Sequence, residues 1–240
     1  MTSLDPPDEP GDLYEARGDV PLASPIMQGD VFAHVSLPGL SEQPLAVAIV
    51  MHPCSMRAGD QLRPKITVAA VRPYQRLLDK DWRTGHVNVM PLPHLRNTDD
   101  WYAIDFREIA TVPSVALSRR ARIASSSRQG ILLLQQRCAF HLTRLVVPLP
   151  NLYEVSLPVF TECELATDWV EAALDAQPGG DEDTTINEAD KAFHAYLDED
   201  DRRRRKRLQH SHLHSDLRRE CRGEIARRYA ASESDRPGRR

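Results

Sequence analysis

The sequence has little of what membrane and secreted proteins contain. Its longest uninterrupted apolar run, Leu45 to Met51, has seven residues, whereas a membrane-spanning helix needs about 20. The chain begins with an acidic, proline-rich stretch, without the basic start and apolar core of a secretory signal. We therefore expect a cytoplasmic protein that does not enter a membrane.

Cysteine is scarce, and the four cysteines stand alone, without the Cys-x-x-Cys spacing of a structural zinc site. In a cytoplasmic chain such residues are reduced thiols. His210, His214 and Cys221 would share one face of a helix and would suit zinc or nickel. Leu217 and Ile225 lie on nearly the same face, so a seam between helices explains the stripe better. We expect no metal and no cofactor.

The glycine motifs of common nucleotide-binding and hydrolase folds are also missing. The sequence contains no Gly-x-x-x-x-Gly-Lys, no Gly-x-Gly-x-x-Gly and no Gly-x-Ser-x-Gly, which excludes the phosphate loop, the dinucleotide fingerprint and the nucleophile elbow. Serine, histidine and aspartate occur without a spacing that singles out a catalytic triad. Any chemistry must come from another arrangement.

What the sequence does contain is separated charge. The net charge of −4 averages four segments: residues 1–30 carry −6, residues 31–160 carry +6, residues 161–200 carry −12 and residues 201–240 carry +8. This pattern indicates a mildly basic folded domain between an acidic lead-in and a dipolar tail. An excess of +6 permits polyanion binding by the middle segment.

An arginine run follows the acidic segment in the tail. These cations would contact the phosphates of RNA or another polyanion, dock a protein partner, pair with the acids that precede them, or remain solvated. No aromatic residue is interleaved with them, so base stacking is not implied. The candidate binding residues of the run are Arg202, Arg203, Arg204, Arg205 and Arg207.

Short strands dominate the middle of the chain. Apolar or alternating runs at residues 31–37, 47–51, 66–71, 87–92, 101–106 and 109–112 are separated by Pro-, Gly- and Asp-rich breaks, and Pro73 would begin a short helix. No long amphipathic helix lies between them, which disfavours a doubly wound sheet. We predict an α+β protein with a small β-barrel.

Helices are predicted after the strands. Capping-box patterns precede an apolar stripe of Ile131, Leu134, Cys138, Leu142 and Leu145. The predicted division is a disordered acidic arm (1–26), a barrel with its terminal helix (27–150), a short acidic helical segment (151–180), one long charged helix (181–230) and a disordered tail (231–240).

Residues Gly29 to Phe32, Leu37 to Gln43 and Val47 to Met51 resemble the PemK/MazF growth-inhibitor family. Members begin with Gly-Asp and a strand, continue through a loop with a Gly-x-Glu-Gln-like stretch, and then enter an apolar strand. The resemblance extends over about residues 28–145. It implies a small SH3-like barrel, a homodimer, and cleavage of single-stranded RNA under control of an antitoxin peptide.

The family's catalytic positions are not matched. Where members carry Arg-Pro at the start of the second strand, this chain has Leu45-Ala46, and where they place Thr or Ser after the third strand, it has Arg72-Pro73-Tyr74. We therefore expect a barrel without the family's ribonuclease chemistry.

The most distinctive short segment is His52-Pro53-Cys54-Ser55-Met56-Arg57. It follows a buried strand directly, so a rigid scaffold would hold it. Cys54 beside His52 and Arg57 would suit an activated thiol, or simply fill a gap in the core. We predict that a binding rim is formed by Glu42, Gln43, His52, Cys54, Arg57 and Arg63.

The leading hypothesis is a non-catalytic binding module for nucleic acid or a protein partner. The first alternative is an endoribonuclease toxin with rearranged catalytic residues, in which His52, Arg57 and Arg63 serve acid–base chemistry and phosphate stabilisation. The second is a structural subunit of a larger complex, docked through its carboxyl-terminal helix.

Overall fold

The protein folds as an α+β structure of two compact units. The computed structural model describes residues 3–37, 39–59 and 61–229, without the side chains of residues 200–202. The first unit, here called the sheet unit, comprises residues 1–21 and 26–155. The second, the helical unit, comprises residues 22–25 and 156–240.

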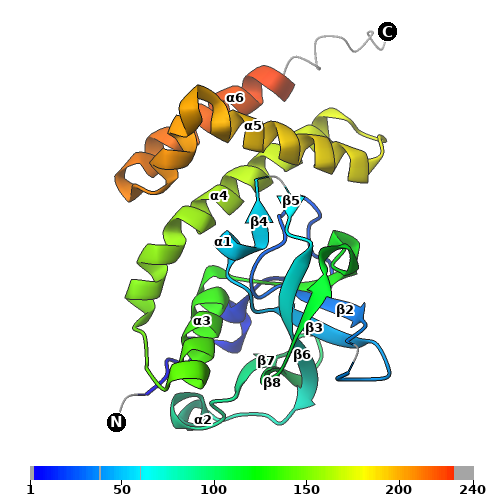
Figure 1. Ribbon diagram of the computed structural model, residues 1–240, viewed down its shortest axis with the longest axis vertical. Helices are drawn as coiled ribbons and strands as arrows, with labels where there is room; N and C mark the ends of the chain where they lie inside the picture. Colours follow the sequence, from blue (N-terminus) through cyan, green and yellow to red (C-terminus); the bar gives the residue numbers. More distant parts are fainter. Residues whose placement is uncertain (1–2, 38, 60, 230–240) are drawn as a thin grey trace. The chain divides into compact units, whose positions relative to one another are not determined.

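The sheet unit contains a seven-stranded antiparallel sheet of order β1-β9-β2-β3-β6-β8-β7 (Figure 1). No pairing joins the edge strands β1 and β7 within the described ranges, so the sheet is open. The predicted closed barrel is thereby corrected. The strands are β1 (Tyr14–Arg17), β2 (Val31–Val35), β3 (Leu45–Ile49), β6 (Lys65–Tyr74), β7 (Val89–Pro93), β8 (Trp101–Pro113) and β9 (Arg122–Ser126).

Two apolar clusters hold this sheet. One contains Val71, Met90 and Ile104 together with Leu133 and Leu134, which belong to α3 (Arg128–Thr143). The second is built from β2, β3, β6 and β8 and from the loops beside them. Because successive strand residues point to opposite faces, a sheet buried on both faces needs apolar residues at consecutive positions. The run from Val47 to Ile49 supplies them and is fully buried.

Local predictions differ from the structure around two strands. Pro73 does not begin a helix, because β6 continues through it to Tyr74, and the helix α2 forms later, at Asp79–Thr84. The two short strands predicted at 101–106 and 109–112 are one strand, β8. A register shift opposite Ala69 and Val71 accommodates this length.

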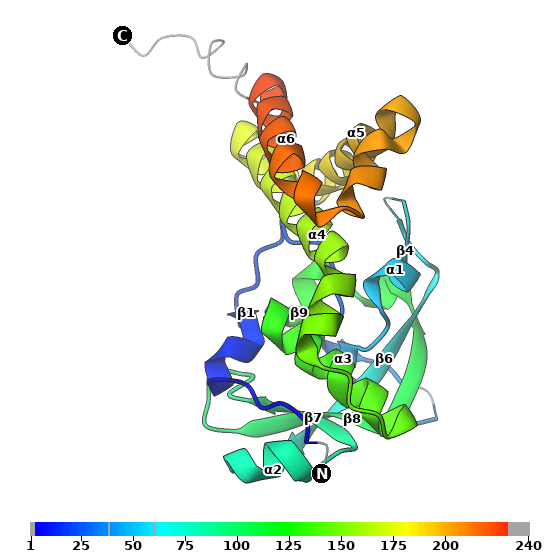
Figure 2. The same cartoon turned by 90° about the vertical axis from the view of Figure 1, so that its left-hand side faces the viewer.

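Residues 3–26 are ordered, in contrast to the predicted disordered arm 1–26. Leu4 and Leu13 are each only 1% exposed, and β1 pairs with β9. A short 3-10 helix, η1 (Pro10–Leu13), precedes β1, and Figure 2 shows this segment beside α3. A few apolar residues suffice to anchor it although the surrounding sequence is acidic and proline-rich.

The Gly29-Asp30 pair has a structural role. Gly29 has a φ of +86°, a conformation that favours glycine, and an added Cβ would meet the Ser126 side chain. Asp30 is fully buried, and Arg122 Nη1 donates to its carboxylate at 2.9 Å. Ser125 Oγ donates to the other carboxylate oxygen at 2.9 Å. The pair therefore joins β9 to the entry of β2.

The helical unit is built from three helices. The helix α4 (Leu149–Ala176) continues into it from the sheet unit, and α5 (Glu182–Leu208), η4 (Ser211–Leu213) and α6 (His214–Tyr229) follow. Trp169 of α4 packs against Phe193 and Tyr196 of α5, with ring centroids 5.8 and 5.2 Å apart. Leu217 and Cys221 of α6 belong to the same core.

The helix boundaries differ from those predicted. The short helical segment 151–180 is the 28-residue α4, and the single helix 181–230 is interrupted after Leu208. His214 stabilises the break: its Nε2 is 2.7 Å from the Leu208 carbonyl oxygen and its Nδ1 is 2.9 Å from Thr161 Oγ1. The predicted tail 231–240 lies outside the described residues. None of the helices among the described residues has the length and apolarity that crossing a membrane requires.

Candidate functional site

The segment after β3 forms a small rigid loop. Pro53–Met56 is a single helical turn, α1, and His52 caps it by accepting the Cys54 N–H at Nδ1, 3.3 Å away. A neutral ring with Nδ1 as acceptor carries its proton on Nε2. Burial lowers the pKa of His52, which favours this neutral form at pH 7.

A two-stranded hairpin continues this loop. Its strands are β4 (Arg57–Ala58) and β5 (Gln61–Leu62). The Arg63 N–H donates to the Met56 carbonyl at 2.7 Å, and Arg57 Nη2 donates to the Ile26 carbonyl at 3.2 Å. The structure therefore brings four predicted site residues onto one connected segment, here called the hairpin site: His52, Cys54, Arg57 and Arg63.

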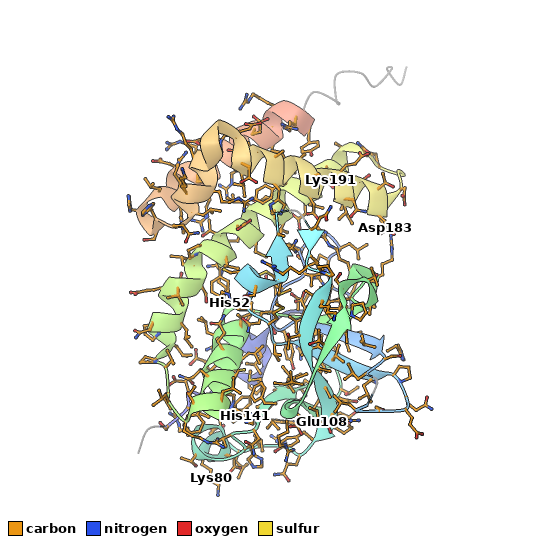
Figure 3. All side chains as sticks on the ribbon, in the orientation of Figure 1. His52, Lys80, Glu108, His141, Asp183 and Lys191 are labelled. Carbon is orange, nitrogen blue, oxygen red and sulfur yellow. The ribbon has the colours of Figure 1, made fainter. Side chains whose placement is uncertain are left out.

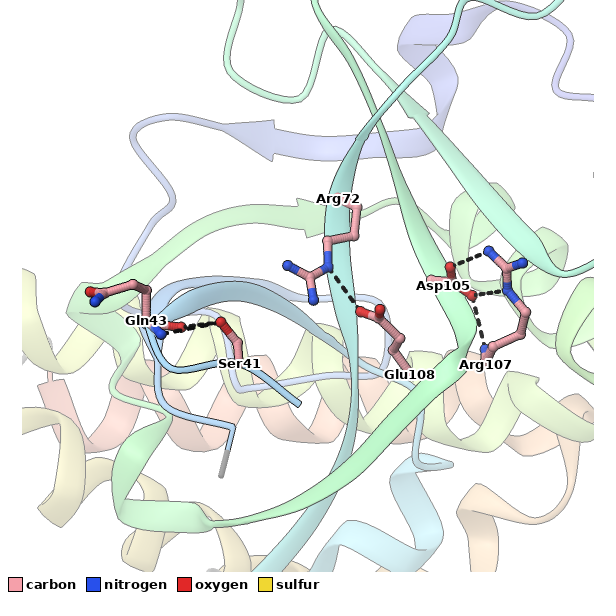
Figure 4. A network of polar contacts seen from close by, with 6 residues as sticks. All are labelled: Ser41, Gln43, Arg72, Asp105, Arg107 and Glu108. Atoms are coloured by element: carbon pink, nitrogen blue, oxygen red, sulfur yellow. Dashed lines mark hydrogen bonds and ion pairs between the residues drawn. The ribbon is translucent and has the colours of Figure 1, made fainter. Parts of the chain in front are cut away.

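The other two predicted rim residues lie elsewhere. Glu42 and Gln43 precede β3, in the loop that joins it to β2, whereas His52 follows β3. A five-residue strand separates these ends by about 16 Å. Both side chains are exposed, and the Gln43 backbone hydrogen-bonds with the Ser41 hydroxyl (Figure 4). The predicted rim is therefore not one surface, because β3 divides it.

Most of the predicted arginine run is engaged inside the helical unit. Arg204 pairs with Glu199 at 2.8 Å, and its guanidinium lies 4.1 Å from the centre of the Tyr196 ring. Arg205 pairs with Asp198 and with Glu162 of α4.

Arg207 donates two bonds to Glu220 of α6, at 2.7 and 3.0 Å. Arg203 is exposed, and the side chain of Arg202 lies outside the described residues. Of the alternatives for the run, pairing with neighbouring acids is therefore the one that Arg204, Arg205 and Arg207 adopt. These three are not cations without a carboxylate partner.

His214 and Cys221, which the sequence places on one helix face as possible metal ligands, have different structural roles. His214 binds Thr161 and the Leu208 carbonyl, and Cys221 is fully buried in the core. No group of three or more potential metal ligands is found among the described residues. Burial raises the pKa of the Cys221 thiol to about 12, as expected for a thiol that packs and does not react.

A polar cluster that the sequence did not indicate lies in the sheet unit. Tyr74, the last residue of β6, contacts His86 through its hydroxyl, 2.5 Å from Nδ1. His86 has a φ of +52°, in the left-handed region that residues with a side chain rarely adopt. Such strained positions concentrate at functional sites.

Arg137 of α3 belongs to the same cluster. The residue is fully buried, its Nη2 donates to the Trp82 carbonyl at 3.1 Å, and its guanidinium lies 5.2 Å from the centre of the Trp82 ring. Its Nε and Nη1 have no hydrogen-bond partner among the described residues. Burial lowers its pKa to about 10, and the nearby Tyr74 opposes this change.

His141 lies one helical turn beyond Arg137, on the same side of α3. Its Nδ1 is 3.0 Å from Asn88 Oδ1, and its ring packs on Phe106 with centroids 5.6 Å apart. Asp105, in β8, is held by Arg107 at 2.6 and 2.9 Å, as Figure 4 shows. Figure 3 places His141 well apart from His52, so this cluster and the hairpin site are different places.

The sequence does not predict this cluster, because the apolar stripe predicted for α3 places the buried face of that helix away from Arg137. Leu142 and Leu145 were assigned to the buried face, but they are 68% and 67% exposed. Ile131 and Leu134 of the predicted stripe are buried as expected, but the buried face continues through Leu133 and Arg137 rather than to Leu142 and Leu145. Arginine is almost never fully buried without a partner, so no sequence pattern points to this position.

Comparison of the chain with protein-family models and with curated protein sequences finds no match.

Proposed function

We propose that the sheet unit binds a polyanion, single-stranded RNA in particular, through the cations of the hairpin site. The proposal follows the leading hypothesis from the sequence, a PemK/MazF-like module that binds nucleic acid without the family's catalytic positions. The proposal assigns phosphate contacts to Arg57, Arg63 and the neighbouring Lys65.

The observation that supports the proposal is a difference in pairing. Arg63 and Lys65 are exposed and Arg57 is partly exposed, and none of the three forms an ion pair within the described part of the chain, which omits Asp60. In contrast, Arg205 and Arg207 of the tail are held by carboxylates. Among the described residues, therefore, no carboxylate has to be displaced from these three cations before a phosphate can bind them.

The test measures binding of a fluorescent single-stranded RNA oligonucleotide by anisotropy between about 50 and 200 mM salt. Replacing Arg57, Arg63 and Lys65 together by Gln removes three phosphate contacts. Because each contact on a single strand contributes about 0.7 to the slope of log affinity against log salt, the slope should fall by about 2.

A matched control replaces three exposed cations of the helical unit, Lys191, Lys206 and Arg222, by Gln. It changes the net charge by the same amount and should leave the salt slope nearly unchanged. Equal losses in both triple variants, or no binding by the wild-type protein, would refute the proposal.

An endoribonuclease is the second candidate, favoured by the tautomer of His52. Because Nδ1 accepts the Cys54 N–H, the neutral ring carries its hydrogen on Nε2, which can donate a hydrogen bond to a phosphate oxygen. The guanidinium of Arg57 stands five positions along the same loop. An N–H donor and a guanidinium on one loop suit stabilisation of the charge that develops on a phosphate during cleavage.

Incubating labelled RNA with the purified protein distinguishes the two candidates. A nuclease cleaves, and His52→Gln abolishes cleavage while RNA binding is retained. The binding module retains RNA in the anisotropy assay and produces no fragments.

A further inference from the structure

We infer that the cluster around Arg137, formed by Tyr74, His86, Arg137 and His141, is a binding site for a phosphate-type oxyanion. It lies in a different part of the sheet unit from the hairpin site. The inference therefore stands whether or not the hairpin binds RNA.

The first argument is the count of donors on Arg137. A guanidinium carries five N–H donors, one on Nε and two on each terminal nitrogen. Nε and Nη1 have no acceptor in the described structure, so at least three of the five are unmatched in a residue with no exposed surface. Buried donors are nearly always satisfied. An acceptor with several oxygens is what this position lacks.

The second argument is what surrounds the guanidinium. Trp82 lies against it, with the ring centre 5.2 Å away, and accepts a hydrogen bond at its backbone carbonyl. Tyr74, His86 and His141 are each partly exposed, so the cluster reaches the protein surface through them. They add a hydroxyl and two imidazoles. Tyr74 and His86 share one hydrogen bond, so one of the two keeps a donor for an oxyanion, and His141, whose Nδ1–H donates to Asn88 Oδ1, donates through Nε2 when its ring is protonated.

The third argument is the charge balance. The carboxylate of Asp105, in β8, would repel an anion in this cluster, but Arg107 donates to both of its oxygens at 2.6 and 2.9 Å. Because this pair is neutral, the charge of Arg137 is not cancelled. Its positive charge is retained at pH 7, since a pKa of about 10 leaves the guanidinium protonated.

The geometry of the donors favours a tetrahedral anion over a carboxylate. A carboxylate offers two oxygens in one plane, which match one edge of a guanidinium. The unmatched donors here are on Nε and on Nη1, and Tyr74 of β6 and His86, which follows α2, stand on other elements than Arg137. A phosphate has enough oxygens to meet donors from several directions.

The experiment uses the full-length protein and inorganic phosphate as the probe, with acetate for comparison. Isothermal calorimetry gives the affinity, and the side-chain Nε–H resonance of Arg137 reports direct contact. Phosphate is expected to bind and to shift this resonance. Arg137→Met should weaken phosphate binding by roughly 10- to 100-fold, the loss expected for removing charge-assisted hydrogen bonds.

Two further variants guard against misfolding and non-specific charge effects. Arg137→Lys keeps the charge but loses the planar fork, so it should bind phosphate more weakly than the wild type. Arg222→Met removes an exposed cation of the helical unit and should bind as the wild type does. Far-ultraviolet circular dichroism of each variant confirms that it is folded.

Three results would overturn the inference: no phosphate binding, binding that is unchanged in Arg137→Met, or acetate binding as tight as that of phosphate. If phosphate binds, a mononucleotide and a pair of oligonucleotides with and without a 5′-phosphate identify the source of the group. Preference for the phosphorylated oligonucleotide assigns the site to a nucleic-acid end, and preference for the mononucleotide assigns it to a small metabolite.

Discussion

The two units of this protein use arginine in different ways. In the helical unit, Arg205 and Arg207 lie near the surface and connect neighbouring helices through carboxylates. In the sheet unit, Arg122 and Arg137 are buried completely. Arg122 meets a buried carboxylate, that of Asp30, whereas Arg137 meets a single backbone carbonyl.

This difference shows which arginine charges affect the stability of the fold and which ones need a partner. Exposed ion pairs contribute little to stability because water screens them. A buried guanidinium is costly to desolvate, so it must be matched from inside the chain or from a ligand. Arg122 is matched by the fold itself, and Arg137 is the residue that indicates an external partner.

The largest expected effect comes from breaking the buried pair of the sheet unit. Arg122→Ala leaves the Asp30 carboxylate buried without its cation, and should lower the free energy of unfolding by about 3–5 kcal/mol. Urea unfolding followed by circular dichroism measures the loss. A double variant, Asp30→Leu with Arg122→Met, should lose less. A loss below about 1 kcal/mol in Arg122→Ala would show that the buried arginine pair of the sheet unit contributes no more to stability than the exposed pairs of the helical unit.

The next effect concerns the packing of the amino-terminal segment. A Cβ added at Gly130 would lie 2.2 Å from the Leu13 carbonyl oxygen, and that oxygen belongs to the backbone, so the segment must shift. Gly130→Ala should cost about 1–3 kcal/mol, as overpacking does, and expose residues before β2 to protease.

Limited proteolysis with mass spectrometry reads out this displacement. Gly223→Ala in α6 is the control, since nothing lies within 4 Å of its added Cβ. Early cleavage should occur in the Gly130 variant alone. The same digestion pattern for both variants would show that the segment does not depend on its contact with α3.

A smaller effect is expected from the ion pairs of the helical unit. Arg205→Ala removes the pairs with Asp198 and Glu162, yet the side chains involved are 26–36% exposed. We expect a loss of about 0.5–1 kcal/mol that shrinks at high salt. Arg222→Ala serves as the reference. A loss as large as that of Arg122→Ala would contradict the comparison.

The smallest effect is a pH dependence. Hydrogen bonds from Arg107 lower the pKa of Asp105, and those from Arg207 lower the pKa of Glu220. A lowered folded-state pKa gives stability that is present above the unfolded pKa, about 4, and is lost as the pH falls through the folded value.

Asp105→Asn should therefore flatten the decline in stability between about pH 5 and pH 3. Glu220→Gln should flatten it less, because Glu220 is more exposed. Urea unfolding at several pH values measures both slopes. Equal slopes in the two variants would show that burial does not separate these carboxylates.

The sequence predicted the α+β class and most strand positions because apolar alternation is a local signal. The run at Val47 to Ile49 is a central strand as expected. Closure of the sheet was not predictable in the same way, since it depends on whether β1 and β7 pair, and no local pattern specifies that. The anchoring of Leu4 depends on partners in α2, more than 70 positions away.

The candidate site was predictable only where it is local. His52, Cys54, Arg57 and Arg63 lie within twelve positions of one another and remain together. Glu42 and Gln43 are predicted to share a rim with them, but the strand β3 lies between the two groups. Arg137 could not be predicted from the sequence, because what distinguishes it is that its buried Nε and Nη1 have no acceptor among the described residues.

The hydrogen bonds between Asp5 and Gln136 join residues 131 positions apart. During synthesis the first residues of the sheet unit leave the ribosome long before their partners in α3 exist. The sheet unit therefore cannot complete its fold until about residue 143 has emerged. Until β9 has emerged, β1 and β2 lack the strand with which both of them pair. Contacts of this separation slow folding, so nascent chains stalled before α3 should remain open to protease, while those stalled beyond it should not.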